Sequence, residues 1–499
     1  MLDRKLGIIS VSDKRGIVDF CKSVSSHFVF ISTGKTANLL ESSNVQVRTV
    51  SNLTNYPEIL DGRVKTLHPK IMGGILGTTH HESELVELDI EPFGLVVSNL
   101  YPFEQVISKP HNLKDAIENI DIGGVTLLRA AAKNYQEVIV VSSPEDYPSV
   151  AKAITNNEVS MDLRKELAVK AFHHTAKYDI AISTYLTAND PFPPSIVAGF
   201  ENPQELRYGE NPHQEARYYL QPGKEPFYEQ LHGKKVSLNN LVDFYSAIGV
   251  LSEHSEPSCA IIKHTSPCGF ASAKDIETAF DHAFATDNLS AFGSVMAFNR
   301  PIPEGLANKL KAMFVDGIIA PEFESKAFEI LSKKKRIILC KFKDYEIPQR
   351  SIRLVPNGIL VQPTDKHSIS EEDIKVVSKR NPSDKELQEL LFAWKIVKYV
   401  KSNSSVICTG TQTLGVGMGQ TSRIGAVELA LNRAGERSKA AVMASDAFFP
   451  YRDSIDAAAK KGITAIIAPG GSIRDNESII AADDADIAFV WSGVRSFLH

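Results

Sequence analysis

The stretch from Ala260 to Gly269, AIIKHTSPCG, carries residue types suited to proton transfer. A short apolar run ends in Lys263 and His264, and a Thr-Ser-Pro turn follows. We therefore expect the pair where a strand leaves its sheet and faces a cleft. Histidine can exchange a proton near neutral pH, and a neighbouring ammonium can stabilise negative charge or protonate a leaving group. The plainer alternative is a solvated lysine beside a core histidine.

The same stretch contains part of the zinc deaminase signature, which requires Pro-Cys-x-x-Cys and His-x-Glu. Pro267-Cys268 is present, but Ala271 occupies the second cysteine position and Ser266 the position of the glutamate. Because ligand positions and the general acid are missing, we do not expect a zinc deaminase.

Two basic segments in the first half are candidate anion sites. Gly34-Lys35-Thr36 follows an apolar strand, but Val29 stands where a P-loop needs its first glycine, so a Walker A motif is excluded. Backbone N–H groups at this helix start still favour a phosphate, with an ordinary N-cap as the alternative. The segment 61–70, DGRVKTLHPK, alternates Arg63 and Lys65, which one extended strand could present on one side. We favour an anion site there over a solvated charge run.

The first 190 residues alternate short apolar runs with helical stretches, which predicts a parallel sheet covered on both faces. A long amphipathic helix is predicted from Leu163 to Tyr185. His173 and His174 lie on it about 100° apart and are interpreted as structural, because adjacent helix residues cannot easily share a metal. The predicted strands are Leu6–Val11, Phe28–Ile31, Leu95–Ser98 and Val138–Val141.

The Pro-rich segment 190–194 is the predicted linker, with a domain boundary near residues 190–200. In the second half we expect a helix from Ile276, a strand Val295–Phe298 and a turn-and-strand unit after Asp316. Ser383 and Glu386 form a capping box for a further helix. Two subdomains, separated by a Pro- and charge-rich connection, show the same order of elements, which indicates an internal duplication.

The composition excludes several classes of protein. Net charge is −5 over 499 residues, so bulk attraction to nucleic acid is not indicated. Five cysteines are scattered without a C-x-x-C pair, and no signal-like region is present, which is typical of a reduced cytoplasmic protein. Apolar runs are too short to span a membrane.

Taken together, these motifs resemble one family, the bifunctional AICAR transformylase/IMP cyclohydrolases of purine biosynthesis. Any one motif is weak, but the ordered set spans nearly the whole chain. The segments that carry the resemblance are 10–14, 61–70, 99–103, 121–133, 207–214, 263–269 and 448–453.

The resemblance implies an α/β fold in two parts. Residues 1–190 would form a methylglyoxal-synthase-like domain with a parallel sheet and the cyclohydrolase activity. Residues 200–499 would form a transformylase domain of two cytidine-deaminase-like subdomains, split near residues 342–375. Family members are homodimers with the transformylase site built across the interface. The co-substrate would be 10-formyltetrahydrofolate, and neither step requires a metal or redox cofactor.

The first implied reaction formylates the 5-amino group of AICAR. His264 would act as general base, and Lys263 would stabilise the oxyanion or protonate the leaving folate nitrogen. Arg207 would hold the 5′-phosphate beside Tyr208. The rest of the AICAR side would be Gly293, Asp316, Asn403, Phe448, Asp453 and Arg495, with Asn403 turning the carboxamide toward His264. The folate side would be Arg423, Ile424, Phe448, Ser472 and Ile473.

The second implied reaction closes the ring of formyl-AICAR to give IMP and water. Lys65 and Tyr101 would donate to the formyl oxygen, and Asp121 and Lys133 would transfer protons. The resemblance implies that the nucleotide is held by Ser12, Lys14, Ser32, Thr33, Gly34, Thr36, Arg63, Lys65, Thr66, Ser98, Asn99, Asp121 and Gly123.

The chain departs from the family pattern at a few positions. Lys35 stands where a glycine is expected, Ser98 where many relatives carry cysteine, and Asn288-Leu289 and Ser294 differ near Gly293. Other hypotheses are a deaminase or a methylglyoxal-synthase-like lyase on the same folds, and a non-catalytic nucleotide-binding regulator. Two further alternatives lie within the family. The cyclohydrolase alone is active, or formate plus ATP supplies the formyl group in place of the folate.

Overall fold

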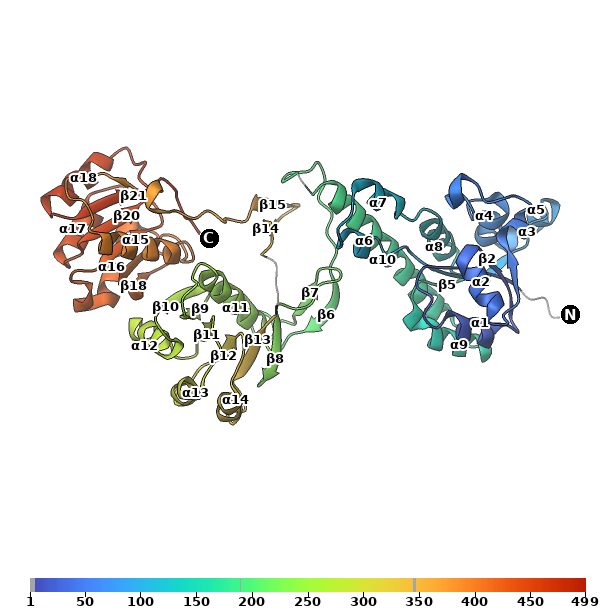
Figure 1. Ribbon diagram of the computed structural model, residues 1–499, viewed down its shortest axis with the longest axis horizontal. Coiled ribbons are helices and arrows are strands. Elements are labelled where there is room, and N and C mark those ends of the chain that lie inside the picture. Colours follow the sequence, from blue (N-terminus) through green and yellow to red (C-terminus); the bar gives the residue numbers. More distant parts are fainter. Residues whose placement is uncertain (1–4, 189, 344–346) are drawn as a thin grey trace. The chain divides into compact units, whose positions relative to one another are not determined.

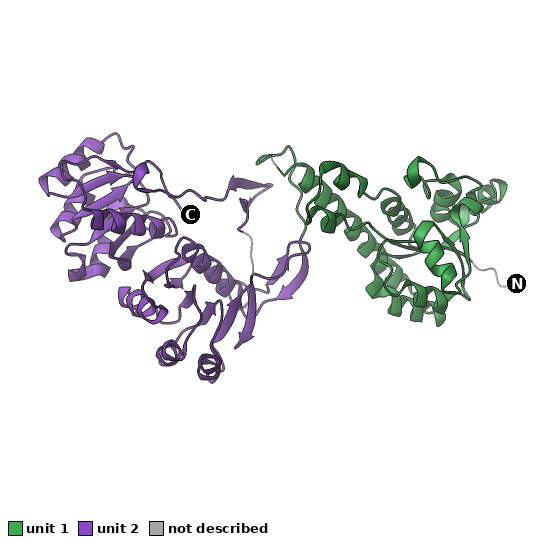
Figure 2. Ribbon diagram, viewed as in Figure 1, with its two compact units in different colours: residues 1–199 green, residues 200–499 purple. Residues whose placement is uncertain are grey.

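The structure is a computed structural model that describes residues 5–188, 190–343 and 347–499. The chain divides into two compact units, residues 1–199 and residues 200–499 (Figure 2). The division falls just after the Pro-rich segment 190–194. Each unit has its own sheet and its own buried core.

Unit 1 is built on a five-stranded sheet in the order β3-β2-β1-β4-β5 (Figure 1). Every neighbouring pair is parallel, as predicted. The sheet reverses its winding direction beside β1, and ligands bind outside the carboxyl ends of strands at such a point. The strands are β1 (Lys5–Val11), β2 (Phe28–Ser32), β3 (Val47–Thr49), β4 (Phe93–Asn99) and β5 (Ile139–Val141).

The helices of unit 1 follow the strands and enclose one core. The predicted long helix is confirmed as α10, which packs on α8. The α-helices are α1 (Ile17–Val24), α2 (Gly34–Ser42), α3 (Val50–Thr54), α4 (Pro69–Leu76), α5 (Glu82–Glu87), α6 (Phe103–Ile107), α7 (Leu113–Glu118), α8 (Gly123–Lys133), α9 (Tyr147–Thr155) and α10 (Met161–Leu186). Short 3-10 turns are η1 (Leu60–Gly62), η2 (Thr79–His81) and η3 (Pro144–Asp146).

Unit 2 is built on a twelve-stranded sheet in the order β16-β21-β20-β19-β17-β18-β10-β9-β11-β12-β13-β8. Two hairpins lie outside it, β6 (Glu201–Glu205) with β7 (Arg217–Leu220) and β14 (Arg350–Val355) with β15 (Gly358–Pro363). The sheet strands are β8 (Tyr228–His232), β9 (Ser258–Lys263), β10 (Ser266–Ser272), β11 (Val295–Phe298), β12 (Gly317–Ala320), β13 (Ile338–Phe342), β16 (Lys375–Val376), β17 (Ser405–Thr409), β18 (Gln412–Gly417), β19 (Val442–Ser445), β20 (Ala465–Ala468) and β21 (Ala488–Trp491).

The predicted internal duplication is confirmed by the order of elements. The run α11-β9-β10-α12-β11-α13-β12-α14-β13, here called half A, is repeated as α15-β17-β18-α16-β19-α17-β20-α18-β21, here called half B. The helices are α11 (Leu238–Leu251), α12 (Ile276–Thr286), α13 (Glu304–Lys311), α14 (Ser325–Ser332), α15 (Asp384–Val397), α16 (Arg423–Ala434), α17 (Asp453–Lys460) and α18 (Asp475–Asp484), with 3-10 turns η4 (Glu371–Asp373) and η5 (Gly435–Ser438).

The two halves join through β10 and β18, which pair antiparallel with Ala271 opposite Gln412. This pairing relates the halves by an approximate two-fold operation. At each edge of the sheet, the strands of half A therefore run in the opposite direction to the corresponding strands of half B. One edge, here called the A-tip edge, carries the turn between β9 and β10, the amino ends of β11 and β12, and the carboxyl ends of β19, β20 and β21.

The buried cores of unit 2 lie on the two faces of its sheet, under the helices that cover each face. One face of the sheet is covered by α11 and α15, and a single cluster with Phe244 and Trp394 crosses from one half to the other. The opposite face has one cluster under α12, α13 and α14 and another under α16, α17 and α18. The continuous cluster therefore holds the two halves in register.

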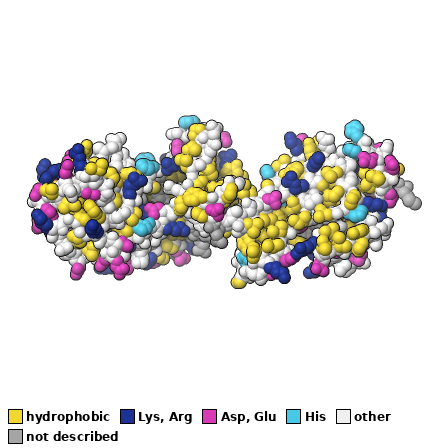
Figure 3. All heavy atoms as spheres, turned by 90° about the horizontal axis from the view of Figure 1, so that it is seen from above, with side chains coloured by type: hydrophobic (Ala, Val, Ile, Leu, Met, Phe, Trp, Pro, Cys, Tyr) yellow, Lys and Arg dark blue, Asp and Glu magenta, His cyan; other side chains and the backbone are white. Residues whose placement is uncertain are grey.

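Acidic and basic side chains are interspersed over the face seen in Figure 3, in keeping with the small net charge of −5. Among the described residues, none of the helices has both the length and the apolar character needed to cross a membrane.

Candidate functional site

Lys263 and His264 lie at the end of strand β9, as expected, and at the tip of a β-hairpin. Lys263 pairs with Ser266, so Ser266-Pro267 begins β10 rather than forming a turn. His264 and Thr265 have φ values of 51° and 66°, as the two central residues of a type I′ turn require. The Thr-Ser-Pro pattern favours a wider turn, and this tight turn at two non-glycine residues is held by a long-range contact.

That contact comes from α11. The backbone N–H of Thr265 donates to Oδ1 of Asp243 at 2.7 Å. One helical turn earlier, Nδ2 of Asn240 donates to Oδ2 of Asp316 at 2.7 Å, and Nζ of Lys234 bonds the other oxygen at 2.5 Å. The amino-terminal half of α11 thus joins the hairpin tip to the loop that precedes β12.

Arg207 and Tyr208 lie beside the start of the same helix. The backbone N–H of Leu238 donates to the carbonyl oxygen of Tyr208 at 3.1 Å. The guanidinium of Arg207 lies over the Tyr208 ring at 4.5 Å and donates to its hydroxyl at 2.9 Å. Nζ of Lys263 donates to the carbonyl of Phe292 at 2.8 Å, which brings Gly293 close to the tip. The predicted site residues of half A, together with Arg207 and Tyr208, therefore lie around the hairpin tip and α11.

Half B contributes Asn403, which is held by Arg423. A guanidinium nitrogen of Arg423 donates to Oδ1 of Asn403 at 2.8 Å, and the other nitrogen forms an ion pair with Asp446. The Arg423 side chain is only 5% exposed, so its charge is already neutralised inside the protein. Arg423, which the resemblance assigns to the folate side, also supports Asn403 through this contact.

The C-terminal segment belongs to the same cluster. The backbone N–H of Ser496 donates to the carbonyl of Asp446 at 3.0 Å, and Ser402 exchanges hydrogen bonds with Leu498. The Arg495 guanidinium lies 4.5 Å from the Phe497 ring centre. The other predicted residues of half B lie in loops or first helical turns: Ile424 is half-buried, while Phe448, Asp453 and Ile473 are exposed and Ser472 is half-buried.

The strand register places these two clusters on the A-tip edge. Gly317, Val295 and Ile262 are successive partners in half A, and Val406, Ala444, Ile467 and Val490 are the corresponding row in half B. Three strand spacings separate β9 from β17 and four separate it from β19, which amounts to about 14 to 19 Å along the sheet at roughly 4.8 Å per strand. The two clusters therefore lie apart on one continuous edge.

Unit 1 has a cavity of about 850 Å³ at the carboxyl ends of β1, β2 and β4. The amino termini of α2 and α8 both open onto it, and such termini attract phosphate. Most of the predicted nucleotide residues line it: Ser12, Lys14, Thr33, Gly34, Thr36, Arg63, Lys65, Thr66, Asn99, Tyr101, Asp121 and Gly123.

The floor of this cavity is built from Asn99 and Lys14. Oδ1 of Asn99 accepts the backbone N–H groups of Ser12 and Asp13 at 2.6 and 2.8 Å, which ties β4 to the loop after β1. Nζ of Lys14 donates to the carbonyl of Val11 at 2.8 Å. Burial and the nearby charge of Lys35 lower the pKa of Lys14.

Asp121 occupies the entrance of α8. Its Oδ1 accepts the Gly124 N–H at 2.7 Å and its Oδ2 the Tyr101 N–H at 3.4 Å. Burial raises the pKa of the Asp121 carboxyl, although these two hydrogen bonds oppose the shift. A carboxyl that keeps a proton above its usual range, next to donors, is suited to proton transfer.

Arg63 and Lys65 do not lie on an extended strand, contrary to the expectation. Residues 60–62 form the turn η1, and only an isolated bridge joins Ile59 to Val64. Both basic side chains nevertheless reach the cavity, where Arg63 pairs with Glu118 and Lys65 with Glu58 at 3.2 Å. Glu118 is the last residue of α7, fifty-five residues from Arg63, so no local sequence signal indicates it, whereas Glu58 lies seven residues before Lys65.

Similarity to known proteins identifies the family. An AICARFT/IMPCHase bienzyme profile matches residues 131–433, and an MGS-like domain profile matches residues 16–126. A bifunctional purine biosynthesis protein PurH of Acetivibrio thermocellus is 46% identical, over 99% of this chain and all of that protein. The PurH proteins of Oceanobacillus iheyensis and Halalkalibacterium halodurans are 45% and 44% identical over the same shares. The chain belongs to the AICARFT/IMPCHase bienzyme family.

Three residues expected from the family pattern lie outside the unit 1 cavity. Ser32 and Ser98 are fully buried, and the hydroxyl of Ser32 donates to the carbonyl of Ile9 at 2.7 Å. Lys133 is the last residue of α8, ten residues after Gly123, so it lies about 15 Å along the helix from the cavity. None of these three residues is among those that line the unit 1 cavity.

Some residues that organise the sites were not predicted. Tyr178 on α10 accepts the Asp121 N–H at 2.8 Å and donates to the carbonyl of Asn119 at 3.0 Å. In unit 2, Asp243 accepts the backbone N–H of Thr265, and Asp446 accepts that of Ser404. All three belong to elements distant in sequence, so no local pattern could have revealed them.

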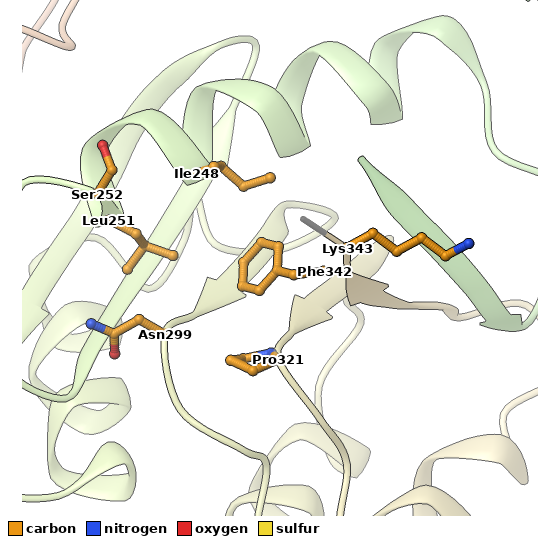
Figure 4. Close-up of a pocket in the computed structure, with 7 residues that line it drawn as sticks. All are labelled: Ile248, Leu251, Ser252, Asn299, Pro321, Phe342 and Lys343. Carbon is orange, nitrogen blue, oxygen red and sulfur yellow. The ribbon is translucent and has the colours of Figure 1, made fainter. Parts of the chain in front are cut away.

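A second cavity of about 590 Å³ lies on the opposite edge of the unit 2 sheet (Figure 4). The carboxyl ends of β11, β12 and β13 form it together with the end of α11, and its lining includes Leu251, Asn299 and Phe342. The predicted site residues all lie elsewhere. Among the described residues, no group of three or more His, Cys, Asp or Glu side chains is arranged to hold a metal.

Proposed function

We propose that this protein catalyses both reactions named for its family, formyl transfer to AICAR in unit 2 and dehydrative closure of formyl-AICAR to IMP in unit 1. The observation that carries the proposal is full-length similarity to bifunctional PurH proteins. It is supported by a cation-lined cavity in unit 1 and a Lys-His pair on the A-tip edge of unit 2.

In unit 1, the two helix termini and Lys14 would hold the 5′-phosphate, because all three present N–H donors or positive charge. Attack of the carboxamide nitrogen on the formyl carbon places negative charge on the formyl oxygen. Lys65 and Tyr101 would donate to that oxygen. Asp121, with its raised pKa, would shuttle the proton that must reach the oxygen before water leaves.

In unit 2, His264 would take a proton from the AICAR amine as it attacks the formyl carbon. Lys263 would stabilise the tetrahedral oxyanion or protonate the folate nitrogen as the carbon–nitrogen bond breaks. Arg207 would hold the 5′-phosphate, and Asn403 would orient the carboxamide. The donor in this proposal is 10-formyltetrahydrofolate, which would lie toward Phe448, Ser472 and Ile473.

The active assembly in this proposal is a homodimer. The predicted AICAR residues form two clusters, one near His264 at the end of β9 and one around Asn403 and the C-terminal segment beside β17 and β19. Three to four strand spacings, about 14 to 19 Å, separate them along the sheet. A second copy, facing the first across the A-tip edge, would supply one cluster to each site.

An anaerobic assay with AICAR and 10-formyltetrahydrofolate tests the proposal. We expect tetrahydrofolate and IMP to form in equal amounts, and supplied formyl-AICAR to give IMP without folate. Formation of IMP from formyl-AICAR with no folate turnover would restrict the protein to ring closure. A parallel assay with formate and ATP tests the alternative donor.

A further inference from the structure

Asp243 is the acidic residue that contacts the hairpin tip of unit 2. It lies on α11, and its Oδ1 accepts the Thr265 N–H at 2.7 Å. Thr265 is β-branched with a φ of 66°, a backbone conformation that such residues rarely adopt unless a contact holds it. The hydrogen bond therefore fixes the turn that presents His264.

Charged neighbours also act on the Asp243 carboxyl. Burial raises the pKa of the Asp243 carboxyl, while the Thr265 hydrogen bond and the nearby His264 favour its ionised form and Asp316 opposes it. Electrostatic coupling between two groups is mutual, so a carboxylate that is favoured by a cationic imidazole also favours that cation.

We infer that Asp243 is a positioning residue for formyl transfer, which fixes the direction of His264 and stabilises the imidazolium that forms when His264 accepts a proton. This inference rests on the proposed role of His264 as general base. The arrangement follows the physical logic of a catalytic histidine held by a buried acid, although here the acid reaches the backbone of the next residue.

Other charged groups near the turn have partners of their own. Asp316 is bound by Lys234 at 2.5 Å and by Asn240. Lys263 donates to the carbonyl of Phe292 at 2.8 Å. The carboxylate of Asp243 therefore differs from that of Asp316, whose negative charge is offset by an adjacent ammonium.

Two substitutions separate the hydrogen bond from the charge. Asp243→Asn keeps an oxygen that can accept the Thr265 N–H but removes the charge, whereas Asp243→Ala removes both. We expect kcat for formyl transfer to fall about 10-fold in Asp243→Asn and about 100-fold in Asp243→Ala, because misplaced catalytic groups lose rate on this scale. Asp281→Asn, at an exposed position on α12, is the matched control and should keep the parent rate.

A proton titration makes the test independent of turnover. Imidazole signals in 15N-histidine-labelled protein would be followed against pH, with His264→Gln assigning the signal among 14 histidines. We expect the titration midpoint of His264 to lie at lower pH in Asp243→Asn than in the parent. The acid limb of the formyl-transfer rate should move in the same direction, since His264 would lose its proton more easily.

An unchanged midpoint together with an unchanged kcat in Asp243→Asn would overturn the inference, whatever Asp243→Ala does, because a purely structural acid keeps its role as an amide. If the parent protein transfers no formyl group, the proposed function fails, while the midpoint shift still decides the coupling of Asp243 with His264. Ring closure in unit 1 should stay at the parent rate in both variants, because Asp243 lies in unit 2, and an unchanged urea-unfolding midpoint of unit 2 would show that this unit is folded.

Discussion

The two candidate sites differ in which strand ends form them. In unit 1, the carboxyl ends of β1, β2 and β4 meet at one edge, and one cavity collects their loops with the amino termini of α2 and α8. In unit 2, half A presents a hairpin tip and the amino ends of β11 and β12, while half B presents the carboxyl ends of β19, β20 and β21. The first site is one pocket, and the second is a long edge.

The antiparallel junction of β10 with β18 explains the difference. Because the halves face opposite ways, the half B counterpart of the His264 turn is Gly410-Thr411, on the opposite edge of the sheet. That turn has no lysine or histidine. Duplication thus doubled the scaffold, but the Lys263-His264 pair stands on one edge alone.

The largest expected effect is a reciprocal loss of the two activities. Asp121→Asn should lower the rate of ring closure about 100- to 10,000-fold, since it removes a group that transfers protons. His264→Ala should lower formyl transfer by a similar factor. Each variant should leave the other reaction at the parent rate, because the cavity of unit 1 and the tip of unit 2 share no residues. The two rates are measured separately with formyl-AICAR and with AICAR plus folate.

Asp19→Asn on α1 is a suitable control for the first variant, because Asp19 is exposed and does not line the cavity. Loss of both activities in either folded variant would contradict the separation of the sites and would favour a single shared site.

The sequence predicted most of the fold because its evidence was local. The apolar runs of unit 1 and the capping box of Ser383 and Glu386 were sufficient to place strands and one helix start. β3 was missed because its three residues, Val47–Thr49, are only half-buried and have no apolar run. The turn at His264 was misplaced because the contact that fixes it comes from Asp243, twenty-two residues upstream.

The sequence indicated which residues form the candidate sites better than it indicated how those residues are arranged. Residues whose motif sits at a strand end, such as Asn99 and Lys14, reach the unit 1 cavity as expected. Arg423 shows the limit of such inference, because the family resemblance assigns it to the folate side without indicating what pairs with its charge. The buried Asp446 that neutralises it could be found only in the folded chain. Burial and pairing, which decide whether a charge is available, depend on tertiary contacts.

A smaller effect is expected from Tyr178→Phe, which tests how unit 1 holds its acid. The hydroxyl of Tyr178 joins the backbone of Asp121 to that of Asn119, so its removal should loosen the loop without removing the carboxylate. We expect ring closure to slow about 10-fold, and the free energy of unfolding of unit 1 to fall by about 1 kcal/mol. Stopped assays and urea denaturation measure the two effects.

Tyr185→Phe is the matched control for this variant. Its hydroxyl lies on the same helix and bonds Nε2 of His111 at 2.9 Å, away from Asp121. An equal loss of ring closure in both variants would mean that α10 acts through general stability rather than through the Asp121 loop.

The smallest expected effect concerns Lys35, the cation that the family pattern lacks at the phosphate loop. Lys35 lines the unit 1 cavity, and its charge lowers the pKa of Lys14, so the two ammonium groups face the same space. A dianionic phosphate between them would relieve this repulsion. Lys35→Gln should therefore raise KM for formyl-AICAR about 2- to 5-fold, as expected for an exposed ionic contact, with kcat unchanged.

The salt dependence distinguishes a phosphate contact from a change in helix stability. In the parent, KM should rise with added salt because ions screen the attraction between Lys35 and the phosphate. In Lys35→Gln this rise should be smaller, whereas Lys22→Gln, an exposed change on α1, should keep the parent dependence. If Lys35→Gln kept the full salt response, the phosphate would be held by Lys14 and the helix termini alone. Lys35 would then be a solvated charge at the rim of the cavity, and the two sites would differ only in their strand geometry.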